Sequence, residues 1–123
     1  MILGKVNARR EAVVPLQIRS ADNRTVYRQI VIDTGFSGFL TLPLTLIISL
    51  KLSLVETRTY TLGDNRNIDF DLYAATVIWD GMDRTILALA TDGDPLMGMS
   101  MLHGYRLFVD VVDGGDVTIE ERA

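Results

Sequence analysis

An apolar segment, Ile30-Val31-Ile32, runs directly into the triplet Asp33-Thr34-Gly35. Three consecutive β-branched apolar residues are typical of a strand that is covered on both faces. The glycine that follows permits a tight turn. The sequence therefore predicts an inner strand that carries the carboxylate of Asp33 at its C-terminal end. Apolar surroundings penalise a charged carboxylate and raise its pKa, so such a residue is suited to acid–base chemistry. An Asp that merely braces the turn is the simpler alternative.

Strand signals dominate the rest of the chain. Val14, Leu16 and Ile18 alternate with proline or polar residues, which indicates a strand buried on one face. Turn-forming residues at 21–24 then predict a hairpin with the strand at 27–32. Asp80-Gly81 predicts a tight turn between two further strands. The other expected strands cover residues 40–42, 55–61, 68–73, 74–79, 84–90, 105–112 and 117–120.

Two short helices are expected. Pro43 suits the first position of a helix, and the apolar residues after it predict a mostly buried helix over 44–54. A second helical pattern follows Gly98 and runs through His103, where Gly104 would end it. The prediction is a single, mainly β domain over residues 1–123, with eight or nine strands, mostly antiparallel, and one or two short helices.

Composition excludes several classes of function. The net charge of −4 and the isoelectric point near 4.8 argue against a nucleic-acid partner, which favours a basic face. The longest uncharged run, residues 36–50, is shorter than the roughly 20 apolar residues of a membrane span, so no membrane association is expected. The chain has no cysteine and its start does not resemble a signal peptide, so a cytoplasmic location is expected.

No metal or cofactor is expected. The acidic pairs Asp69/Asp71, Asp92/Asp94 and Asp113/Asp116 lack the spacing of a calcium loop. Nor does the chain predict a serine hydrolase. The segment around Ser37 has Phe39 where the nucleophile elbow requires glycine, and the single histidine, His103, is interpreted as structural or exposed.

Residues 30–38 resemble the catalytic loop of retropepsin-like aspartic peptidases. A second match lies late in the chain, where Leu96-Met97-Gly98 and the helical segment after it resemble the family's apolar-apolar-Gly strand and short helix. The polar hairpin over 57–73 falls where the family has its flap. The phenylalanine directly after the triplet, Phe36, resembles the small bacterial single-domain members of the family, in which a phenylalanine stands at this position. The resemblance spans roughly residues 10–120 and implies a retropepsin-like acid-protease barrel.

The resemblance implies an aspartic endopeptidase that is active as a homodimer on a peptide or protein substrate. The two copies of Asp33, one from each subunit, would share a proton and activate a water molecule. Thr34 would hydrogen-bond across the dimer axis, and Gly35 would leave room for substrate backbone. The remaining implied site residues are Phe36 and Ser37 in the active-site loop, Leu62, Gly63, Asp64 and Asn65 in the flap, and Leu96, Met97 and Gly98 as support.

In this family the chain termini form a sheet between subunits, so residues 1–6 and 117–121 are the expected intersubunit strands. The alternative function is a non-catalytic dimerisation or peptide-binding domain that keeps the retropepsin-like fold. The intact Asp-Thr-Gly triplet favours the enzyme. The hairpin tip, with Gly63 as its one glycine, departs from the glycine-rich flap of retroviral members and favours the alternative.

Overall fold

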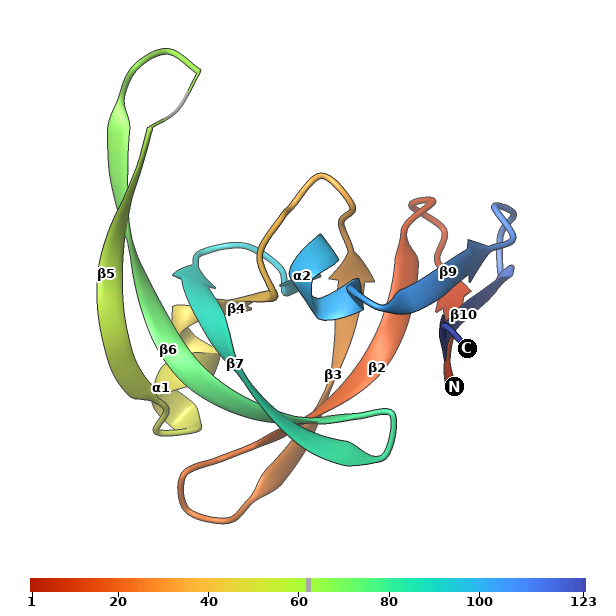
Figure 1. Ribbon diagram of the computed structural model, residues 1–123, viewed down its shortest axis with the longest axis horizontal. Helices are drawn as coiled ribbons and strands as arrows, with labels where there is room; N and C mark the ends of the chain where they lie inside the picture. Colours follow the sequence, from red (N-terminus) through yellow and green to blue (C-terminus); the bar gives the residue numbers. More distant parts are fainter. Residues whose placement is uncertain (62) are drawn as a thin grey trace.

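The structure, a computed structural model, describes residues 1–61 and 63–123 (Figure 1). Ten strands and two short helices make up the described part of the chain. The strands are β1 (Ile2–Val6), β2 (Ala12–Arg19), β3 (Thr25–Ile32), β4 (Leu40–Pro43), β5 (Ser53–Thr61), β6 (Asn67–Trp79), β7 (Met82–Thr91), β8 (Leu96–Met97), β9 (Tyr105–Val109) and β10 (Asp116–Glu121). The helices are α1 (Leu44–Ser49) and α2 (Met99–Leu102). The mainly β fold class with two short helices is confirmed, with ten strands instead of the expected eight or nine.

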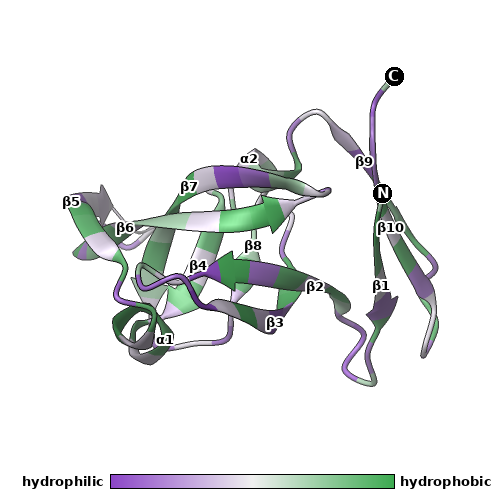
Figure 2. Ribbon diagram, turned by 90° about the horizontal axis from the view of Figure 1, so that it is seen from below, coloured by the Kyte–Doolittle hydropathy of each residue, from purple (hydrophilic) through white to green (hydrophobic). Residues whose placement is uncertain are grey.

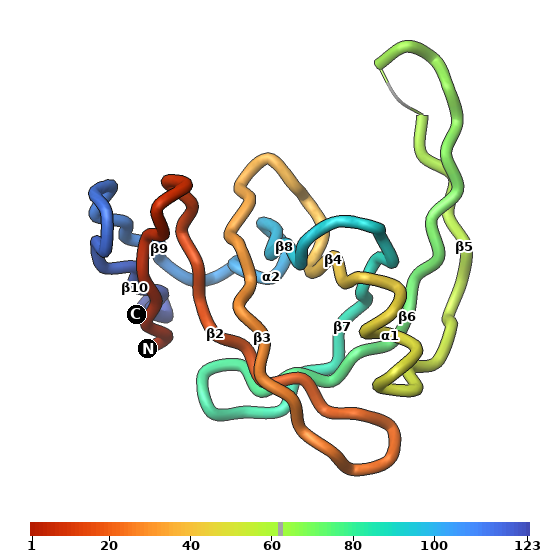
Figure 3. Tube along the Cα trace, turned by 180° about the vertical axis from the view of Figure 1, so that it is seen from behind, coloured from red at the N-terminus to blue at the C-terminus, as the bar shows by residue number. Residues whose placement is uncertain are grey.

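The strands form one sheet in the order β5-β6-β7-β4-β8-β3-β2-β1-β10-β9. A further pairing between β2 and β6 closes β6, β7, β4, β8, β3 and β2 into a ring. Two pairs are parallel, β3 with β8 and β4 with β7, and the others are antiparallel. The long β5–β6 hairpin projects from one side of this ring, and strands β1, β10 and β9 lie at the opposite end (Figures 1 and 3).

The core fills the ring. Hydrophobic and hydrophilic segments alternate along β2 (Figure 2), and Val14, Leu16 and Ile18 are buried as predicted. Side chains in a strand point alternately to the two faces, so this pattern fixes the face of β2 that turns inward. Trp79 is also buried, and its ring meets Tyr105 edge to face at 5.4 Å between centroids. That contact ties β6 to the start of β9.

The expectation that helix α1 continues to residue 54 is wrong. The helix ends at Ser49, and Lys51 has a φ of 56°, in the left-handed region. The Lys51 N–H donates to the Ile48 carbonyl and the Leu52 N–H to the Ile47 carbonyl. This is a Schellman ending, which satisfies the last carbonyls of the helix and turns the chain into β5. This helix end requires a residue in the left-handed conformation. The sequence does not predict one at position 51, because lysine and not glycine stands there.

The expected turn at Asp80-Gly81 is confirmed, whereas several strand bounds differ, and the two strands expected at 68–73 and 74–79 form the single strand β6. Asp80 and Gly81 both have positive φ, 50° and 83°, and Trp79 pairs with Met82. These are the features of a two-residue type I′ hairpin turn, as predicted. Strand β9 ends at Val109 instead of residue 112, because the Val112 N–H bonds back to the Asp110 carbonyl. Phe70 is half-buried and packs edge to face on Tyr60 in the projecting hairpin.

The left-handed residue at the end of α1 yields a prediction about stability. Replacing Lys51 by Gly should raise the free energy of unfolding by about 0.5–1 kcal/mol, because glycine adopts positive φ without a Cβ penalty. Urea unfolding of both proteins measures the change. The matched control is Lys51→Ala, which removes the same ion pair with Asp22 but keeps a Cβ. Equal stability of the two variants would contradict this account of the helix end.

Candidate active site

Asp33 follows β3 directly, and the backbone of β8 fixes its position. Strand β8 runs parallel to β3, with Val31 beside Leu96 and Ile32 beside Met97. The Asp33 N–H donates to the Met97 carbonyl at 2.8 Å, which extends this ladder by one step. Asp33 is therefore held at the C-terminal end of a strand within the closed ring, where the sequence predicted it.

The far end of the loop, residues 33–39, is held by the same short strand. Strand β8 also pairs antiparallel with β4, with Leu40 beside Met97, and the Gly98 N–H donates to the Phe39 carbonyl at 2.9 Å. Strand β8 thus lies between the two strands that flank the loop. Backbone hydrogen bonds to Met97 and Gly98 hold the two ends of the loop. These bonds define the position of Asp33 relative to the ring of strands.

Within the loop, the carboxylate of Asp33 is half-buried and partly engaged. Its Oδ1 accepts the Gly35 N–H at 3.0 Å, while the Asp33 carbonyl accepts the Phe36 N–H at 3.1 Å. These two bonds orient the side chain on a tight turn. Among the described residues, none donates a hydrogen bond to Oδ2. One oxygen is therefore hydrogen-bonded within the loop, and the other has no donor among the described residues.

Gly98 and helix α2 pack against the loop, and the first residues of α2 hydrogen-bond to it. The Met99 N–H donates to the Phe36 carbonyl at 2.8 Å, and the Ser100 N–H donates to the Gly38 carbonyl at 3.1 Å. A Cβ on Gly98 would lie 2.3 Å from the Gly38 carbonyl oxygen and 2.7 Å from that of Phe36. The close approach of loop and helix therefore requires glycine at 98. The structure brings Leu96, Met97 and Gly98 together with the loop that the sequence assigned them to support.

The ring of Phe36 packs against its own loop, next to Gly38 and Gly98. A Cβ on Gly38 would lie 2.5 Å from Cζ of Phe36, and a Cβ on Gly98 would lie 2.6 Å from its Cδ2. The aromatic ring thus occupies the space that these two glycines leave. Phe36 is not among the residues that line the cavity beside Asp33. Its position is that of a packing residue within the loop.

Two residues that sequence reasoning missed hold this region. Thr41 is buried, and its Oγ1 accepts the Leu96 N–H at 3.0 Å, which satisfies the first donor of β8. Ser100 Oγ donates to the Ser37 carbonyl at 2.5 Å. The sequence does offer a signal for Thr41. It stands between Leu40 and Leu42 in an apolar strand, and a hydroxyl that is buried there needs a hydrogen-bond partner. No comparable signal marks Ser100.

A cavity of about 450 Å³ opens beside the carboxylate. Asp33 and Thr34 form one part of its lining, and Arg10 and Glu11 another. Most of the remaining lining is apolar. It includes Ile32 of β3, Leu107 and Val109 of β9, and Val111 in the segment after β9. Asp33 thus lines a largely apolar hollow that extends to the terminal strands.

A second cavity, of about 590 Å³, lies between the projecting hairpin and the segment after β7. Its lining carries three carboxylates, those of Asp69, Asp71 and Asp92. Thr57 donates to Asp71 at 2.7 Å and Thr59 donates to Asp69 at 2.5 Å across the hairpin. The hairpin therefore contributes both polar residues and Phe70 to this lining.

The structure does not bring the expected flap residues together with Asp33. Leu62 lies outside the described residues. Gly63, Asp64 and Asn65 are exposed at the hairpin tip, where the Arg66 side chain bonds the Asp64 carboxylate at 2.6 Å. This tip stands well away from the loop between β3 and β4 (Figure 1). In one chain the site is therefore open on the side of the hairpin.

The serine and histidine side chains near the loop do not form a nucleophile–base pair. His103 is exposed and lines a surface hollow with Ser37 and Ser100. In the part of the chain that the structure describes, no hydrogen bond joins either hydroxyl to the imidazole. The same residues contain no group of three or more His, Cys, Asp or Glu that could hold a metal ion.

The contact beneath the loop yields a second prediction. Gly98→Ala should lower the free energy of unfolding by at least about 1–3 kcal/mol, because the new methyl group meets backbone oxygens that cannot rotate away. Gly93→Ala is the matched control, since a Cβ there meets nothing within 4 Å. Chemical denaturation of the three proteins measures both changes. Equal stabilities would mean that the loop is not clamped as described.

Comparison with known proteins supports the same architecture. No protein-family model and no curated protein matches the chain. Two solved structures match with a probability of 1.00. A retropepsin-like aspartic protease from Rickettsia conorii superposes with a TM-score of 0.60 at 15% identity, over 98% of this chain and 90% of that one. EIAV protease, solved with the inhibitor HBY-793, superposes with a TM-score of 0.54 at 17% identity, over 78% of this chain and 88% of that one. The chain has the fold of the retropepsin-like aspartic proteases.

Proposed function

We propose that this protein, with residues 1–123 forming a single domain, is an aspartic endopeptidase and that its active form is a homodimer. The observation that carries the proposal is the position of Asp33: it lies at the end of an inner strand, accepts a hydrogen bond through one carboxylate oxygen and lines a cavity. The retropepsin-like fold supports the same assignment. Because the chain supplies one such carboxylate, a second copy has to supply the other.

The reaction follows from two carboxyl groups that share one proton. A water molecule between them attacks the carbonyl carbon of the peptide bond and gives a proton to the ionised Asp33. The protonated Asp33 of the other subunit donates its proton to the carbonyl oxygen. The tetrahedral diol then collapses as its C–N bond breaks. One hydroxyl returns its proton to a carboxylate, and the leaving nitrogen takes a proton from the other carboxyl group. The pair ends with one shared proton, as it began.

The residues around Asp33 have supporting roles in this proposal. Thr34 hydrogen-bonds across the dimer axis and holds the two loops together. Gly35 is proposed to keep the approach open for the substrate backbone, and Ser37 to hydrogen-bond near the loop or to that backbone. The hairpin of β5 and β6 closes over the peptide and excludes water. No cofactor is needed for these steps.

The substrate and compartment are the remaining parts of the proposal. A peptide or protein substrate is proposed to lie between the active-site loop and the hairpin, beside the polar cavity lined by Asp71 and Asp92. No helix in the described part of the chain is long and apolar enough to cross a membrane. Because the chain has no cysteine to oxidise, we place the enzyme in the cytoplasm.

The direct test is cleavage of a peptide library by the wild type and by Asp33→Asn. Removing the acid–base group should lower kcat by about 10²–10⁴-fold or more. The dimer should persist, because the amide keeps the size and hydrogen-bonding shape of the carboxylate. Asp113→Asn, in the exposed turn before β10, is the matched control and should cleave normally. Binding of peptides with no cleavage by any of the three proteins would favour the non-catalytic domain instead.

The pH dependence of cleavage tests the shared proton separately. Activity requires one carboxyl group ionised and the other protonated, so kcat/KM should fall on both the acid and the alkaline side of an optimum. Initial rates across the pH range measure the profile, with sedimentation at each pH to exclude dissociation as the cause. A rate that does not change from acid to neutral pH would contradict the mechanism.

A further inference from the structure

A surface hollow of about 380 Å³ lies where the loop of residues 33–39, helix α2 and strand β7 meet. It shares no lining residue with the cavity beside Asp33 or with the cavity beside the hairpin. None of its lining residues is acidic, and four of them carry hydrogen-bond donors in their side chains. The lining consists of Ser37, Phe39, Arg84, Met99, Ser100 and His103. In a chain with a net charge of −4, this hollow is a local exception.

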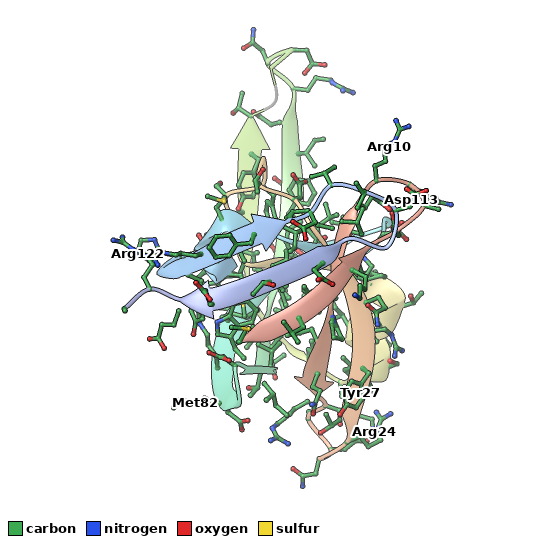
Figure 4. All side chains as sticks on the ribbon, turned by 90° about the vertical axis from the view of Figure 1, so that its right-hand side faces the viewer. Arg10, Arg24, Tyr27, Met82, Asp113 and Arg122 are labelled. Carbon is green, nitrogen blue, oxygen red and sulfur yellow. The ribbon has the colours of Figure 1, made fainter. Side chains whose placement is uncertain are left out.

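Arg84 differs from every other basic residue of the chain. All other lysines and arginines are exposed, as Figure 4 shows for Arg10 and Arg122, whereas Arg84 is half-buried. Among the described residues no carboxylate forms an ion pair with it. Withdrawing a charge from water costs free energy unless an opposite charge or hydrogen bonds replace the water. Arg84 thus brings a positive charge to the hollow without a counter-ion from the chain.

Two contacts hold the guanidinium of Arg84 in place. Its Nη1 donates to the Met101 carbonyl at 3.1 Å, and its Cζ lies 5.5 Å from the centre of the Phe39 ring. A guanidinium has five N–H groups, and in the part of the chain that the structure describes the others have no acceptor. Because the group is already oriented, little conformational freedom is lost when its remaining N–H groups bind an anion.

The other donors come from both sides of the hollow. Ser37 belongs to the loop, and its exposed hydroxyl has no hydrogen-bond partner among the described side chains. Ser100 of α2 donates through Oγ to the Ser37 carbonyl at 2.5 Å, which holds the two walls of the hollow together. His103 directly follows α2 and is exposed. Its imidazole donates through one ring nitrogen when neutral and through both when protonated.

We infer that this hollow binds a phosphate group, either free or as the ester of a small molecule. Arg84 supplies the positive charge and a fork of N–H groups, which matches two phosphate oxygens. The Ser37 hydroxyl and the His103 imidazole donate to the remaining oxygens. The inference goes beyond the proposed function, because it concerns a binding site that the cleavage reaction does not use.

The chemistry of the lining favours phosphate over other ligands. A cation is repelled by Arg84 and finds no carboxylate in the lining. A carboxylate ligand has two oxygens, which the guanidinium alone satisfies, so the donors of Ser37 and His103 would add nothing. A phosphate ester has three acceptor oxygens and close to two negative charges. It therefore uses the whole set of donors.

A bound phosphate joins three segments that are far apart in the sequence. Ser37 lies in the loop that carries Asp33, Arg84 in β7, and His103 after α2. Without a ligand, these segments are connected by the bond from Ser100 to the loop and the bond from Arg84 to α2. A ligand that binds only the folded arrangement stabilises it by mass action. Phosphate should therefore raise the midpoint of thermal unfolding.

His103 makes the test direct, because it is the only histidine of the chain. Inorganic phosphate is added to the wild-type protein at constant pH and ionic strength, and the imidazole proton resonances are followed by NMR. They should shift and saturate with a dissociation constant in the millimolar range, and the unfolding midpoint should rise over the same concentrations. O-phosphoserine is titrated in parallel. Tighter binding of the amino acid identifies an ester as the ligand, and equal or weaker binding identifies free phosphate.

Two variants test the donors by titration calorimetry. Arg84→Gln removes the charge but keeps an amide that can reach the Met101 carbonyl, and it should weaken phosphate binding about tenfold or more. His103→Gln changes an exposed side chain, so it tests the site even where Arg84→Gln does not fold, and it should weaken binding about twofold to tenfold. The matched control is Arg28→Gln. Arg28 also lacks an ion pair within the described chain, but it is exposed and lines a different hollow. It should bind phosphate like the wild type.

Several results would overturn the inference. One is a wild-type protein whose resonances and unfolding midpoint do not respond to phosphate. Another is the same response to chloride or acetate at equal ionic strength, which would mean general screening. Unchanged binding in both Arg84→Gln and His103→Gln, or an equal loss in Arg28→Gln, would place the phosphate elsewhere. These readouts do not involve cleavage, so the phosphate site and the peptidase activity stand or fall separately.

Discussion

The structure depends on the insertion of a two-residue strand between two others. Strand β8 offers backbone groups to β3 on one side and to β4 on the other. Without it, the ring of strands would be open at the place where the chain leaves β3. The bonds from Asp33 to Met97 and from Gly98 to Phe39 are the last steps of these two ladders. The pairing of β8 with β3 and β4 thus both closes the barrel and positions Asp33.

That arrangement leaves no room for a side chain at Gly98. The loop must curve over Gly98 so closely that two carbonyl oxygens lie within 3 Å of where a Cβ would be. The Phe36 ring fills the remaining space beneath it, next to Gly38. Because protein interiors are packed at crystal-like density, such a loop has few alternative conformations. In the proposed reaction, such a rigid support for Asp33 would lower the reorganisation needed.

The features that sequence reasoning recovered are local in origin. The alternation of Val14, Leu16 and Ile18 reports burial directly, and Asp80-Gly81 carries its own turn chemistry. Strand β8 is different, because Leu96-Met97 is too short to show any period. Its place became predictable through the resemblance of the whole segment to a known family. The position of Asp33 at a strand end was available from the sequence, whereas the partners of that strand were not.

What the sequence could not provide are the features fixed by contacts between distant segments. The helix end at Lys51 depends on a left-handed residue that is not glycine, so propensity pointed to a longer helix. The inward position of the Phe36 ring depends on Gly98, more than sixty residues away. The unpaired edge of β9 emerges only when β10 is known to lie between β1 and β9. Each of these is a tertiary contact overriding or completing a local preference.

The projecting hairpin illustrates how the fold divides rigid from less restrained parts. Every described residue of β5 is exposed, and the hairpin is held internally by Thr–Asp hydrogen bonds and the Tyr60–Phe70 contact. A segment with little burial against the body can change its position at low free-energy cost. The loop that carries Asp33, by contrast, is anchored by backbone ladders on both sides. The fold thus combines a firmly held carboxylate with a hairpin that is little restrained by the body of the protein, and the proposed closure of the hairpin over a peptide would need both.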